Sequence, residues 1–178
     1  MEGFREYSDS SGVFSIAVPE NAEVLIQDPA RLESDREPID FSWLVLEGTG
    51  LVVRLTCFRL HDWHKYVTYN QERTKEQYSE EALLLSAERI IQRFPKNADS
   101  VIQWDKNLLQ KEIPGGFVSL RLATWWGSNS VPHSLTCFAA VSDEWIATGS
   151  IEEDVPLSTG LIVRSFSFVP PSTRGDWD

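Results

Sequence analysis

Residues 101–126 have the sequence VIQWDKNLLQKEIPGGFVSLRLATWW, and this stretch decides the fold. The Pro-Gly-Gly sequence at 114–116 is a strong turn signal between two long segments rich in apolar residues. In the second segment, apolar and polar residues alternate over 118–122, which is the period of a strand with one buried face. The stretch therefore predicts an antiparallel hairpin of two long strands.

Further strand patterns lie on both sides of this hairpin. Six other segments have the alternation or composition of strands: residues 14–18, 24–27, 39–45, 51–60, 135–141 and 145–151. Gly48-Thr49-Gly50 separates the third of these from the fourth, and Ser142-Asp143-Glu144 separates the last two. We therefore expect two more hairpins, paired by adjacency in the chain.

One strong helix is predicted between the strand-rich halves. Ser79 supplies a capping hydroxyl, and Glu80 and Glu81 place acidic side chains in the first turn. Apolar residues then recur with helical spacing from Leu83 to Phe94, and Pro95 stops the helix. We expect a helix from Ser79 to Phe94 that lays one face on the sheet.

The C-terminal segment is compatible with two structures. Asp154 could cap a helix that has Pro156 in its first turn, whereas Gly160 weakens that helix and residues 161–168 can also form a strand. We favour a short helix followed by a terminal strand.

These patterns together predict an α+β fold: a largely antiparallel β-sheet with one long amphipathic helix on one face and a shorter C-terminal helix near the other. The 178 residues are 42% hydrophobic, which is enough for one well-packed core. We expect a single domain over residues 1–169. Residues 170–178 are rich in Pro, Ser, Thr and Gly and are expected to form a flexible tail.

The chain is acidic, with 16 Lys and Arg against 27 Asp and Glu and a formal net charge of -11. Such a balance argues against a surface that neutralises nucleic acid phosphates or anionic lipids. No segment approaches the ~20 apolar residues that cross a bilayer, and the first residues lack the pattern of a signal peptide. We expect a cytoplasmic protein that neither binds nucleic acid nor inserts into a membrane.

The sequence contains no convergent catalytic set. Cys57 and Cys137 match no metal or redox spacing, so we expect buried free thiols. No nucleophile elbow is present, and no glycine loop opens a helix. His61 and His64 flank Asp62 with the spacing of one helical turn, but a zinc site needs three or four converging ligands. We expect no catalytic residue, metal or cofactor, with a metal-dependent enzyme using these two histidines as one alternative.

Aromatic residues are the best candidates for a binding surface, because the chain has seven tryptophans. Trp125 and Trp126 are adjacent in a predicted strand and therefore point to opposite faces, so at least one lies outside the main core. Trp63 and Tyr66 lie in the polar segment before the predicted helix. We take these four residues as candidate partner-binding residues, since exposed tryptophans are frequent hot spots.

The two ends of the chain resemble the PsbP-like superfamily. Residues 7–19, YSDSSGVFSIAVP, are similar to its opening motif, in which an aromatic residue and a turn glycine precede a strand that ends in proline. Residues 143–148, DEWIAT, and 164–168, RSFSF, resemble its last strands, joined by a short helix. The chain departs from the pattern at residues 20–22, where many members have Gly-Trp.

The resemblance implies binding without catalysis, because the superfamily includes photosystem II extrinsic proteins, a Ran-binding import factor and bacterial Eag-type chaperones of type VI secretion effectors. We therefore expect a non-enzymatic protein-binding module, possible roles being a chaperone or adaptor for a secreted effector. A second alternative is an immunity protein whose acidic surface neutralises a toxin. Salt would slow the association of such a charge-steered pair.

Overall fold

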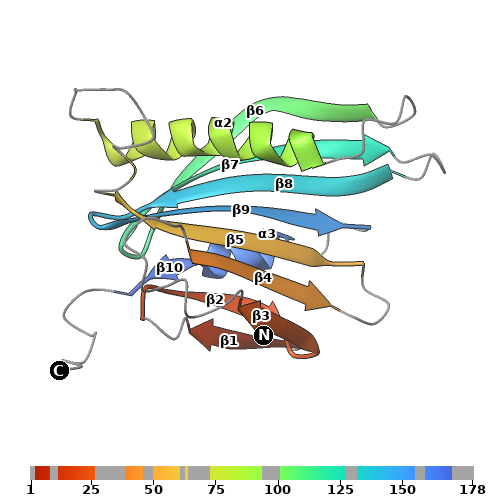
Figure 1. Ribbon diagram of the computed structural model, residues 1–178, viewed down its shortest axis with the longest axis horizontal. Coiled ribbons are helices and arrows are strands. Elements are labelled where there is room, and N and C mark those ends of the chain that lie inside the picture. Colours follow the sequence, from red (N-terminus) through yellow and green to blue (C-terminus); the bar gives the residue numbers. More distant parts are fainter. Residues whose placement is uncertain are drawn as a thin grey trace.

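A seven-stranded antiparallel sheet runs through the protein, with helices on opposite faces and a three-stranded sheet packed beside the shorter helix (Figure 1). The computed structural model describes residues 3–8, 12–26, 39–45, 50–60, 63, 73–93, 101–126, 132–154 and 159–169. The elements are β1 (Phe4–Ser8), β2 (Phe14–Pro19), β3 (Ala22–Ile26), β4 (Ile39–Val45), β5 (Val52–Arg59), α2 (Lys75–Arg93), β6 (Val101–Ile113), β7 (Gly116–Trp126), β8 (Pro132–Val141), β9 (Trp145–Glu153), α3 (Thr159–Ser165) and β10 (Ser167–Phe168).

The large sheet has the order β3-β4-β5-β9-β8-β7-β6, and the small one the order β1-β2-β10. Every neighbouring pair is antiparallel, and the three predicted hairpins are present as β4–β5, β6–β7 and β8–β9. The predicted α+β architecture is confirmed. The predicted tail at residues 170–178 lies outside the described residues.

Strand alternation divides the apolar side chains into two cores, one on each face of the large sheet. On β9, Ile146 belongs to the core under α2, whereas Ala147 belongs to the core shared with β2 and α3. The helix α2 packs over β7, β8 and β9, and α3 packs against β2 on the opposite face (Figure 1). The long and the short helix therefore occupy opposite faces, as predicted.

An aromatic cluster around Phe166 joins the two sheets. The fully buried Phe166 ring is stacked on Phe14 of β2, with 5.5 Å between the ring centroids, and its centroid lies 6.1 Å from that of Phe138 in β8. Phe168 meets Phe166 edge to face at 5.2 Å. The backbone N–H of Phe168 also donates to the carbonyl oxygen of Pro114 at 3.1 Å, in the β6–β7 turn. The last strand therefore contacts both sheets.

Gly149 makes room for this cluster. It lies directly opposite Phe138 in the β8–β9 ladder. A Cβ at Gly149 would lie 2.6 Å from the carbonyl oxygen of Arg54 and 2.7 Å from the Phe138 ring. Both distances are shorter than any ordinary carbon contact, so only glycine allows the Phe138 ring to lie across the strand.

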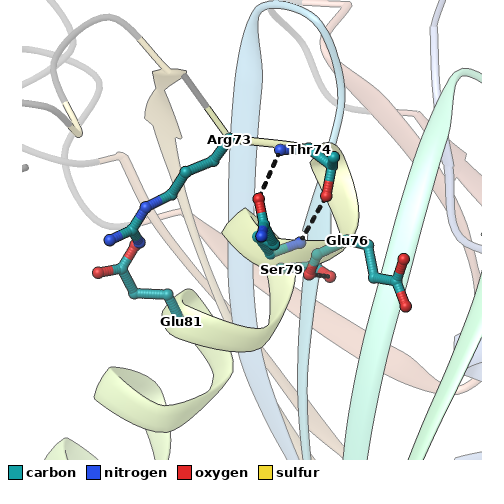
Figure 2. Close-up of polar contacts among 6 residues, drawn as sticks. Arg73, Thr74, Glu76, Ser79 and Glu81 are labelled. Carbon is teal, nitrogen blue, oxygen red and sulfur yellow. Dashed lines mark hydrogen bonds and ion pairs between the residues drawn. The ribbon is translucent and has the colours of Figure 1, made fainter. Parts of the chain in front are cut away.

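The helix α2 begins about one turn earlier than predicted, and Ser79 is not its cap (Figure 2). The N–H of Gln77 donates to Thr74 Oγ1 at 3.2 Å, and the N–H of Thr74 donates to Gln77 Oε1 at 3.0 Å. This reciprocal pair is a capping box. An ion pair between Arg73 and Glu81 adds to this helix end. The Ser79 prediction was wrong because the true start lies in a polar segment without apolar periodicity.

Ser79 instead joins the helix to the sheet. Its hydroxyl donates to the carbonyl oxygen of Glu76 at 2.8 Å and lies 2.6 Å from the Ser119 hydroxyl of β7. Because Ser79 has a single hydroxyl hydrogen, Ser119 is the donor to it, and Ser119 in turn accepts from Gln110 Nε2 at 3.1 Å. These hydrogen bonds give both buried hydroxyls, those of Ser79 and Ser119, a partner between α2 and the sheet.

The predicted short C-terminal helix and the terminal strand after it are both confirmed, although the helix begins at a later residue than expected. The helix α3 begins at Thr159, and the Asp154 carboxylate hydrogen-bonds the His133 ring. The described residues 159–169 then pass from α3 into β10.

Replacing Gly149 with Ala is expected to lower the free energy of unfolding by about 1–3 kcal/mol, because the new methyl group overlaps the Arg54 carbonyl and the Phe138 ring. The matched control is Gly160→Ala in α3, where a Cβ meets nothing within 4 Å. That change should raise stability by up to about 1 kcal/mol. Urea unfolding of both variants measures the difference, and equal effects would refute the packing argument.

Replacing Thr74 with Ala is expected to cost about 0.5–2 kcal/mol, because the Gln77 N–H loses its capping partner. Thr74→Ser keeps the hydroxyl and should stay within a few tenths of a kcal/mol of the wild type. Thermal and urea unfolding followed at 222 nm provide the measurement. A Thr74→Ala protein as stable as the wild type would show that the capping box contributes nothing.

Candidate functional site

A groove opens on the face of the large sheet opposite α2. Along β7, successive side chains on this face become steadily less covered: Val118 is 2% exposed, Leu120 is half-buried and Leu122 is 36% exposed. The cover supplied by β2, β10 and α3 therefore ends partway along the strand. The remaining space has a volume of about 930 Å³.

The floor and walls of the groove come from four elements. Leu120, Leu122 and Trp126 of β7 supply an apolar floor, continued by Thr136 of β8. Leu109 of β6, 49% exposed, contributes to one side. The helix α3 forms the opposite side. A groove of this size, mostly apolar with a few polar groups, has the character of a binding site.

One cation stands on each side of the groove. Lys106 lies in β6 at an irregularity between Trp104 and Leu108, and Arg164 lies in the last turn of α3. Both are exposed, and neither forms an ion pair within the part of the chain that the structure describes. The neighbouring Asp105 carboxylate accepts the N–H of Asn107 at 3.0 Å, inside the same irregularity.

The four predicted partner-binding residues do not form one surface. Trp126 lines the groove and is half-buried. Trp125 points to the opposite face, where its ring centroid lies 4.8 Å from that of His133. Trp63 is 3% exposed and packs in the core beneath α2, so its side chain presents almost no surface to a partner. Tyr66 lies outside the described residues.

A second, smaller pocket of about 220 Å³ lies at the other face, beside Trp125 and His133. Here His133 Nδ1 lies 2.7 Å from Asp154 Oδ1, an arrangement that can orient an imidazole. Nucleophilic catalysis would also need a hydroxyl or thiol hydrogen-bonded to the ring. Within the described ranges no such group bonds His133.

Both cysteines are buried thiols that form no disulfide, as predicted. Cys57 belongs to the core on the α3 face and Cys137 to the core beneath α2, with β9 between their strands. Burial, reinforced by the charge of Glu152, raises the pKa of Cys137 to about 12. A thiol with such a pKa stays protonated near neutral pH, which disfavours Cys137 as a nucleophile.

His61 and His64, the predicted alternative metal site, lie outside the described residues. Among the residues whose positions the structure does describe, no group of three or more His, Cys, Asp or Glu side chains could hold a metal ion. No helix in the same part of the chain has the length and apolar character needed to span a bilayer.

Comparison with known proteins relates this architecture to solved structures. No family model and no curated protein matches the chain. The solution structure of cyanobacterial PsbP (CyanoP) from Synechocystis sp. PCC 6803 matches with a TM-score of 0.56 at 11% identity, covering 93% of this chain and 92% of that one. A Bacteroides thetaiotaomicron protein matches with a TM-score of 0.53 at 8% identity, and this chain spans 50% of its length.

The layered α+β architecture and the structural matches define the class: a sheet-based fold with α2 on one face of the large sheet and α3 on the other. Its particular form is PsbP-like, which confirms the fold implied by the sequence motifs. At this level of identity the likeness concerns the fold alone.

The raised pKa of Cys137 predicts a pH effect on stability. The folded state keeps the proton up to about pH 12, whereas the unfolded thiol ionises around its ordinary value of 9.0. This contribution is therefore fully present below pH 9 and is lost as the pH rises towards 12. The free energy of unfolding should fall more steeply over this range in the wild type than in Cys137→Ala, and parallel curves would show that Cys137 is not perturbed.

Proposed function

We propose that this chain is a non-enzymatic protein-binding module that holds an amphipathic helix of another protein in the groove between β6, β7, β8 and α3. The observation that carries the proposal is the loss of cover along β7, which leaves Leu122 and Leu109 exposed on the same sheet face that is fully covered at Val118. Apolar sheet faces are normally buried against a second layer. A helix from a partner would supply the missing part of that layer.

The dimensions of the groove suit a short helix. From Leu120 to Trp126 the floor extends over seven residues of β7, and the six steps between them span roughly 20 Å at the rise of an antiparallel strand. A helix covers that distance in about 14 residues. Its apolar side chains, spaced at i, i+3, i+4 and i+7, would pack on Leu122 and Trp126. The partner helix would lie beside α3 on the same face of the sheet.

Within this class, we favour a chaperone or adaptor that shields an apolar segment of a secreted effector. The sequence resemblance to the PsbP-like superfamily and the PsbP-like fold support this role. Residues 1–37 carry nine Asp and Glu against three Arg and form the most acidic part of the sequence. In this proposal the groove, rather than that acidic segment, is the binding surface.

Site-specific photo-crosslinking tests the proposal. A photoreactive amino acid replacing Leu109 in the cells of origin should give an adduct with another protein, mapped by mass spectrometry to an apolar helical segment. The matched control is Leu84 of α2, which is 52% exposed against 49% for Leu109 but lies on the opposite side of the sheet. No adduct is expected there.

Binding of the identified partner then provides a quantitative prediction. Leu109→Asp should weaken it by at least about tenfold, because a buried leucine contributes about 1.5–3 kcal/mol. Leu84→Asp should leave it within about twofold. Adducts with a second copy of the chain or with lipid alone, or equal effects of the two substitutions, would overturn the proposal.

A further inference from the structure

We infer that the helix held in the groove carries acidic side chains along both flanks of its apolar stripe. This inference rests on the proposed function and adds the charge of the partner. Its basis is the placement of Lys106 and Arg164 on opposite sides of the groove, without an ion-pair partner among the described residues.

The geometry places the partner's flanks against these cations. A helix that packs its apolar stripe on Leu122 and Trp126 turns the neighbouring positions of its surface towards the two sides of the groove. One side presents the Lys106 ammonium and the other the Arg164 guanidinium. Carboxylates suit both, and the planar guanidinium can bind one through two parallel hydrogen bonds.

The Asp105 carboxylate does not reverse this preference. It accepts the Asn107 N–H at 3.0 Å and so is engaged by its own strand irregularity. The groove-lining charges, one carboxylate and two cations, sum to a positive lining.

Local charge outweighs the overall charge at physiological salt. The net charge of -11 disfavours an acidic partner at long range. At 0.15 M ionic strength, however, the screening length is about 8 Å, so exposed charges farther away contribute little. Direct contacts at about 4 Å are screened least, and they are made with Lys106 and Arg164.

Three synthetic peptides of about 14 residues test the inference. They share one leucine stripe and differ only in the flanking residues, which are Glu, Gln or Lys. Fluorescence anisotropy at 0.15 M salt should rank their affinities Glu, then Gln, then Lys. Each exposed ion pair between the peptide and Lys106 or Arg164 should change the affinity by about two- to fivefold. The double variant K106E/R164E should reverse the order.

The control variant is Lys111→Glu, on the same strand but outside the groove lining. Lys111 lies roughly 16 Å along the strand from Lys106, beyond the screening length, so its reversal should leave the order unchanged. If the wild type binds the three peptides with equal affinity and the Leu109→Asp variant binds none of them, this inference is overturned but the proposed function stands. An order unchanged in K106E/R164E would also overturn it. No saturable binding of any peptide would remove both.

Discussion

The packing of Phe166 between Phe14 and Phe138 is the interaction on which the rest of the structure depends. It is the point where the small sheet, the large sheet and α3 meet, and its ring is fully buried. Phe166 directly follows α3, so the place where this ring docks sets where the helix ends. Deleting such a ring from a core costs about 3–5 kcal/mol, a large part of the stability of an ordinary domain. The aromatic cluster therefore anchors α3 beside β2 and leaves the outer half of the sheet face uncovered.

The two faces of the large sheet are closed by different means. On the α2 face, a 19-residue helix covers β7 to β9, and its buried Ser79 hydroxyl accepts a hydrogen bond from Ser119. Because α2 runs along the strands (Figure 1), its length determines how much of each strand it covers. On the other face, the seven residues of α3 extend only about 10 Å, which is roughly three residues of a strand. The groove thus follows from the unequal lengths of the helices, and both of its cations stand where the short helix and the edge strand border the open floor.

The sequence predicted the strands and hairpins well, because alternation and turn residues are local signals that the sheet keeps. The two motifs that resembled the PsbP-like superfamily lie at opposite ends of the chain, yet they meet in the structure, where Ser167 and Phe168 pair with Ser15 and Phe14. The capping box at Thr74 was missed because it lies in a polar segment. The groove could not be predicted, since Leu109 and Leu122 have the same strand pattern whether or not α3 reaches them. The burial of Trp63 could not be predicted either, since the polar segment that contains it gives no sign that its ring packs beneath α2.

The edge strand β6 bears on how a partner can bind. At 13 residues it is a long edge, and exposed edges invite another strand to add to the sheet. Its register shifts between Trp104 and Leu108, where Asp105 and Lys106 are charged. Lys111 and Glu112 are charged near the end of the strand. Bulges and charges of this kind are common protections of sheet edges. The irregularity that interrupts strand addition also carries Lys106 to the side of the groove. A single local feature of β6 thus disfavours pairing along the edge and favours packing on the face, which is the mode expected for a helix.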